Sequence, residues 1–74
     1  MYETINIKAL DNYQIWIKFN DGQEKVVDIR PFLNKGIAKD LLDPEKFNQV
    51  KIDSGGGIYW ANGYDFCPNF LRSL

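Results

Sequence analysis

The sequence predicts an α+β fold: a small antiparallel β-sheet, a meander of about five short strands, with two or three short helices. The first observation is that apolar and polar residues alternate along two stretches of the first half, which is the period of a half-buried strand. The second is that turn residues such as glycine and asparagine separate these stretches. The third is that apolar residues adopt helical spacing after Pro31.

All 74 residues, 1–74, are expected to form a single domain, because domains typically have roughly 100 to 150 residues and this chain is shorter. A core of this size supplies only about 3 to 5 kcal/mol of net stability. Cys67 is the only cysteine and the chain has no histidine, so neither an internal disulfide nor a zinc site is expected to add to it. Self-association is the remaining means of stabilisation.

Three strands are predicted in the first half. The first two run from Ile5 to Ala9 and from Tyr13 to Phe19, with apolar side chains at every second position. The third runs from Glu24 to Ile29 and ends where Pro31 removes a backbone donor. Together they predict a β-meander.

The turn at Asn20-Asp21-Gly22 decides the register of the second hairpin. A two-residue loop would place Lys18 opposite Lys25 and pair like charges. A three-residue loop with Gly22 in the left-handed conformation avoids this. The predicted pairs are then Ile15 with Val27, Tyr13 with Ile29, and Lys18 with Glu24.

The same reasoning applies to the first hairpin. Leu10-Asp11-Asn12 is expected to form a three-residue loop in which Asn12 adopts the left-handed conformation. The predicted pairs are Ile7 with Ile15 and Ile5 with Ile17. One face of the sheet would then be continuous and apolar.

The second half is predicted to hold short helices and two more strands. A helical stripe is formed by Ile37, Ala38, Leu41 and Leu42. Asp43 followed by Pro44 reads as an N-cap and first helical residue, and Pro68 opens a last short helix. The strands are expected at Val50–Asp53 and Ile58–Ala61, on either side of a glycine-rich hairpin loop.

Few residues suggest a catalytic, metal or phosphate site. Asp28, Asp53 and Asp65 form a candidate polar site, as a general acid–base pair or as ligands of a divalent ion, although roles in caps and turns are the favoured explanation of these acids. The glycines 55–57 are followed by strand residues and not by the lysine and helix of a phosphate-binding loop. Cys67 has no histidine base. No cofactor is therefore expected.

The charge pattern disfavours nucleic acid as a partner, and the lack of a long apolar stretch disfavours a membrane. Nine basic and ten acidic residues are interleaved along the chain, so no basic patch is expected to attract a polyanion. No apolar stretch approaches the roughly 18 residues that cross a bilayer, and the first ten residues do not form a secretion signal. The predicted location is the cytoplasm.

Trp16 is the most informative side chain. Its parity places it with Val26 on the sheet face opposite to Ile15 and Val27, the face that the pattern treats as outer. Two readings remain open: the second half of the domain covers Trp16, or Trp16 is exposed as an anchor for a protein partner or a second copy of the chain.

Several ordinary motifs in this order resemble a bacterial family, the domain of unknown function numbered 2442. The motifs are Ile15 to Phe19, Asp21-Gly22, Val27-Asp28-Ile29, Leu42-Asp43-Pro44 with Phe47, Ile58-Tyr59-Trp60, Asn62-Gly63 and Asp65. The resemblance implies a small α+β fold without an established activity. It also implies relatives fused to a helix-turn-helix domain and short proteins of antitoxin-like pairs. Ala61 and Cys67 depart from the family pattern, and a hydroxyl at position 67 would cap the last helix better.

The sequence thus favours a non-catalytic protein-interaction or regulatory module, with an antitoxin-like role as one form of it. A component of a nucleic-acid-binding regulator is the alternative, and a small carboxylate-based enzyme is a third hypothesis that requires the three aspartates to share one cleft.

Overall fold

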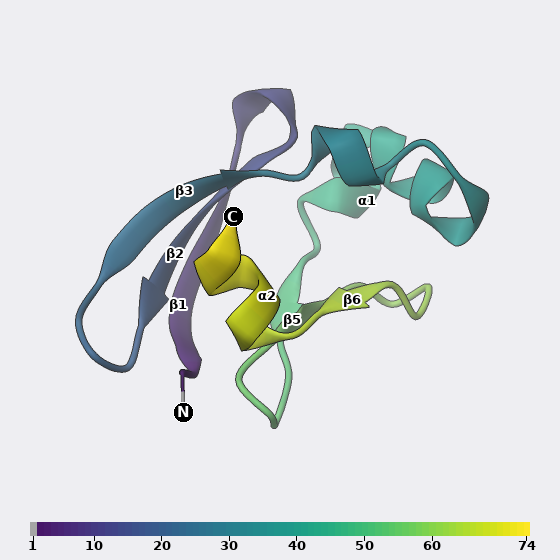
Figure 1. The fold of residues 1–74 in the computed structure, drawn as a ribbon. Coiled ribbons are helices and arrows are strands. Elements are labelled where there is room, and N and C mark those ends of the chain that lie inside the picture. The colour runs from purple at the N-terminus through teal and green to yellow at the C-terminus, as the bar shows by residue number, and fades with distance from the viewer. Residues whose placement is uncertain (1) are drawn as a thin grey trace.

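A computed structural model describes residues 2–74 and confirms the α+β class (Figure 1). The strands form two antiparallel sheets of three strands each within these residues. The first sheet contains β1 (Thr4–Leu10), β2 (Gln14–Phe19) and β3 (Glu24–Asp28); the second contains β4 (Lys51–Ile52), β5 (Ile58–Tyr59) and β6 (Asp65–Phe66). The meander of the first half is therefore as predicted, whereas the later strands form a sheet of their own.

The helices are short, and several have 3₁₀ geometry. The 3₁₀ segments are η1 (Asp11–Tyr13), η2 (Arg30–Phe32) and η3 (Gly36–Leu42), and the α-helices are α1 (Pro44–Phe47) and α2 (Pro68–Ser73). Asp43 caps α1 as predicted, because its carboxylate accepts a hydrogen bond from the backbone N–H of Glu45 at 3.0 Å. Cys67 caps α2 through a weak N–H···S contact of 3.4 Å from Phe70, so the helix forms without a hydroxyl.

The predicted register of the second hairpin is confirmed. Ile15 pairs with Val27 and Lys18 pairs with Glu24, while Ile29 lies just beyond β3 and donates its N–H to Tyr13. Gly22 has a φ of 88°, in the left-handed region that the three-residue loop requires.

Gly22→Val is therefore expected to destabilise the fold by about 1 to 2 kcal/mol, because a β-branched residue resists positive φ. A Cβ at this position meets no other atom within 4 Å, so the cost is purely one of backbone conformation. Thermal melts followed by circular dichroism measure it. A variant that melts with the wild type would show that the loop does not need this conformation.

The predicted register of the first hairpin is wrong by two residues. Ile7 pairs with Ile17, and Ala9 pairs with Ile15. The loop is the η1 segment, in which both Asn12 and Tyr13 have positive φ, of 61° and 60°. Asn12 behaves as predicted, but Tyr13 leaves the strand because its hydroxyl donates to the carbonyl of Leu42 and its ring packs on Phe47. A shift of two keeps every side chain on its face, so alternation cannot detect it.

A bulge between Thr4 and Asn6 interrupts the continuous apolar face that was predicted for β1. The extra residue changes the parity of the strand end, so that Thr4 is buried and Ile5 is 55% exposed. Because of the two-residue shift, Ile17 faces Ile7 and not Ile5, and the apolar face of β1 begins at Ile7, which packs against the core.

The core lies between the first sheet and the elements of the second half. Ile15, Ile17 and Phe19 of β2 are fully buried on the inner face of the sheet. Figure 1 shows α2 and the second sheet on this side of β1, β2 and β3. Trp60 is the largest side chain of the core, and its indole N–H donates to the carbonyl of Phe47 at 2.9 Å.

The 3₁₀ geometry of η3 alters the predicted helical stripe. Three residues per turn place Ala38 and Leu41 on one face, and both are buried. Ile37 is rotated out of this face and is 54% exposed. An α-helical period would have grouped it with the buried residues.

Candidate interaction surface

We define the outer face as the side of the first sheet that points away from the core. Its middle row consists of Lys8, Trp16 and Val26, which pair across β1, β2 and β3. Of these pairs, that of Trp16 with Val26 follows from the predicted register. The side chains of this face, taken from the strand parity, are Asn6, Lys8, Leu10, Gln14, Trp16, Lys18, Glu24, Val26 and Asp28.

Trp16 belongs to this outer face and not to the core. It is neither among the buried side chains nor among the partly buried ones that pack against them. Its indole N–H donates to the carboxylate of Glu24 at 3.1 Å, which fixes the ring across β2 and β3. Val26 beside it is 52% exposed. Trp16 itself is half-buried, because its ring lies across its neighbours on the strands.

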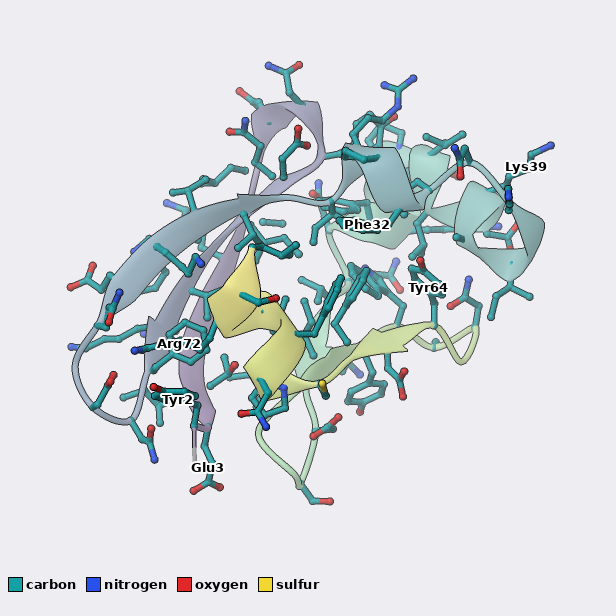
Figure 2. The ribbon with its side chains drawn as sticks, in the orientation of Figure 1. Tyr2, Glu3, Phe32, Lys39, Tyr64 and Arg72 are labelled. Atoms are coloured by element: carbon teal, nitrogen blue, oxygen red, sulfur yellow. The ribbon has the colours of Figure 1, made fainter. Side chains whose placement is uncertain are left out.

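The inner side of the sheet, by contrast, is occupied by α2. Arg72 forms an ion pair with Asp21 at 3.1 Å, and its guanidinium lies 4.0 Å from the centre of the Tyr2 ring (Figure 2). The backbone N–H of Gln23, and then Arg72, hold the pKa of Asp21 below its usual value. Lys25 donates to the carbonyl of Arg72 at 3.0 Å. These contacts fasten α2 to the inner side of the sheet, opposite to the outer face.

The three candidate aspartates do not come together at one site. Asp53 and Asp65 line the same pocket of about 430 Å³, beside the second sheet. Asp28 is at the end of β3 in the other sheet, where it accepts a hydrogen bond from the N–H of Arg30 at 3.2 Å. Asp53 accepts from the N–H groups of Gly55 at 2.8 Å and Gly57 at 3.0 Å. Its carboxylate thus shapes the glycine loop, as turn residues do.

The glycine loop is a packing element. The carbonyl of Gly56 accepts the N–H of Thr4 at 2.8 Å, which joins the loop to the first strand. Both Gly56 and Gly57 are buried. A Cβ at Gly56 would lie 2.8 Å from the backbone of Glu3, so the absence of a side chain permits this close approach. The sequence suggested a hairpin loop here but gave no sign of its contact with β1.

Sequence reasoning missed a second group of exposed apolar side chains, on α2 and at the residue directly after it. Phe70 is 38% exposed and stacks on Phe66 with ring centres 5.6 Å apart. Leu74 is 41% exposed. The spacing of Phe70 and Leu74, one helical turn, was the signal that could have revealed them.

The part of the chain that the structure describes was searched for groups of metal-binding side chains and for membrane-spanning helices. Among residues 2–74, no three side chains of the types that bind metal ions gather in one place. None of the helices in this range has both the length and the apolar character required to cross a bilayer.

Comparison with known proteins identifies the family alone. No curated protein and no solved structure matches the chain. The model of one protein family matches residues 4–73, nearly the whole chain, from the start of β1 to the end of α2. The chain therefore belongs to the family described as "Protein of unknown function (DUF2442)".

Proposed function

We propose that the protein is a non-catalytic protein-interaction module that binds its partner through the outer face of the first sheet. The observation that carries this proposal is the position of Trp16, which lies outside the core and beside the exposed Val26. Tryptophan is enriched among the residues that dominate binding energy, and an exposed apolar patch on a small domain marks a contact site.

The charges of the outer face favour a protein partner over nucleic acid. Its two lysines, Lys8 and Lys18, are balanced by Glu24 and Asp28 on the same face. Lys18 lies directly opposite Glu24 in the sheet. Phosphate contacts need an excess of positive charge, whereas a protein interface accommodates mixed charges around an aromatic centre.

The separation of Asp28 from Asp53 and Asp65 supports the non-catalytic part of the proposal. A regulatory role of the antitoxin-like kind is one form that such a module takes, and it rests on the family resemblance alone.

Trp16→Ala and Val26→Ser test the proposal when tagged protein is used to capture partners from a lysate of its natural cells. We expect the wild type to retain a partner, either another protein or the untagged chain, and Trp16→Ala to weaken its binding by about 30-fold, which corresponds to about 2 kcal/mol. Both variants should keep the wild-type circular dichroism spectrum, because neither side chain belongs to the core.

Ile37→Ser is the matched control, since Ile37 is as exposed as Val26 but lies on η3. It should retain the partner. Equal retention by all the variants, or an unfolded Trp16→Ala, would contradict the proposal.

A further inference from the structure

We propose that the occupant of the outer face is a second copy of this chain, stacked face to face about a two-fold axis that runs parallel to the strands between β2 and β3. This inference rests on the proposed function and specifies its partner. In this arrangement Trp16 packs on the partner's Val26, and Lys18 meets the partner's Glu24.

The distribution of charge on the outer face is the first argument. Both acids, Glu24 and Asp28, lie on β3, at one edge of the sheet. Both lysines lie on the other two strands, Lys8 on β1 and Lys18 on β2. The face therefore carries no net charge but has an acidic side and a basic side. A surface of this kind is complementary to itself only when the basic side of one copy covers the acidic side of the other.

Symmetry then selects the direction of the axis. A two-fold axis parallel to the strands exchanges β2 of one copy with β3 of the other, so that unlike charges meet. A two-fold axis across the strands, through the row of Trp16, instead places Glu24 over the partner's Asp28 and Lys8 over the partner's Lys8. That arrangement opposes like charges. Near-parallel strands are also the usual geometry of two packed antiparallel sheets.

Pairing of strand edges is the other way in which a sheet protein forms a dimer, and the residues of β3 oppose it. An antiparallel pair of β3 strands centred on Val26 would set Glu24 opposite the partner's Asp28 in both halves. Charged edge positions on a short strand are a common protection against such pairing. The face, and not the edge, is thus the part of the sheet that suits a second copy.

A small domain gains stability when it buries apolar surface against a second copy. Residues 1–74 contain one cysteine and no histidine, so they offer neither an internal disulfide nor a histidine-containing zinc site as a source of stability. Burial of Trp16 and Val26 between two copies removes further apolar surface from water.

Charge reversal at the predicted contact tests the inference. In sedimentation equilibrium, wild-type protein should be a dimer at tens of micromolar. Lys18→Glu alone and Glu24→Lys alone should each dimerise about tenfold more weakly or worse, because each opposes like charges twice across the axis. An equimolar mixture of the two variants should form a heterodimer, and the double reversal Lys18→Glu/Glu24→Lys should again dimerise.

Lys39→Glu is the control, because it makes the same charge change on η3, where Lys39 points into solvent away from the first sheet (Figure 2). It should leave the dimer intact. A strictly monomeric wild type would overturn the inference, as would a mixture of the two variants that fails to associate. If the wild type is monomeric but still captures a different protein in a manner that depends on Trp16, only the second copy is excluded and the proposed function stands.

Discussion

Replacement of Trp60 by alanine is expected to unfold the protein at room temperature. Trp60 is 2% exposed, and its ring packs against those of Phe47, Tyr64 and Phe66. Truncation of a buried tryptophan costs about 3 to 5 kcal/mol, which is as large as the whole net stability of a core of this size. The carbonyl of Phe47 would also lose its buried donor.

The other tryptophan of the chain provides the matched comparison. Trp16→Ala removes the same side chain from the outer face, and its far-ultraviolet circular dichroism should remain that of the folded protein. Trp60→Ala should give the spectrum of an unfolded chain. A folded Trp60→Ala with an unchanged melting temperature would show that the core is not centred on this residue.

Gly57→Ala is expected to have the second largest effect, a loss of about 3 kcal/mol. An ideal Cβ at this position would lie 2.4 Å from the backbone oxygen of Phe66 and 3.1 Å from the carboxylate of Asp53. The first of these atoms belongs to β6, so the strand itself would have to move. That movement would strain the second sheet, because Gly57 also accepts the N–H of Asp53 at 2.9 Å.

Gly55→Ala is the control for this substitution. A Cβ at Gly55 would meet only a carboxylate oxygen of Asp53, at 3.4 Å, which is an ordinary contact. Urea denaturation of both variants should therefore show a large loss of stability for Gly57→Ala and a small one for Gly55→Ala. Equal midpoints would mean that the loop and β6 are not packed as closely as described.

The sequence was most informative where a turn or a helix cap of a few residues determined the local backbone geometry. The turn at Gly22 allowed only one register that avoided opposed lysines, and the structure has that register. Asp43 followed by Pro44 likewise marked the start of α1. In each case the physical cause lies within a few residues of the chain.

The missed features depend on distant contacts. Tyr13 turns away from β2 because of a hydrogen bond to Leu42, 29 residues away, and this moved the first hairpin by two positions. The bulge that exposes Ile5 leaves no mark in the alternation. A strand as short as β6 has too few residues for any period to be read, so the division into two sheets was not visible.

In the candidate site, too, the features that local sequence determines were predicted and those that depend on distant contacts were not. Strand parity placed Trp16 and Val26 together on one face, and the structure pairs them. Whether that face was covered depended on where α2 and the second sheet pack, which no local pattern determines. The three aspartates were grouped by residue type alone, and Asp28 lies on a different sheet from the other two.

Binding of a second copy of the chain at the outer face can be examined by nuclear magnetic resonance of the two indole N–H groups. The chain has two tryptophans, so each gives one resolved signal. As the concentration of ¹⁵N-labelled protein rises from low micromolar to millimolar, we expect the Trp16 indole and the amides of Val26 and Glu24 to shift together while the Trp60 indole stays fixed. Shifts confined to α2 around Phe70, or no concentration dependence at all, would contradict this expectation.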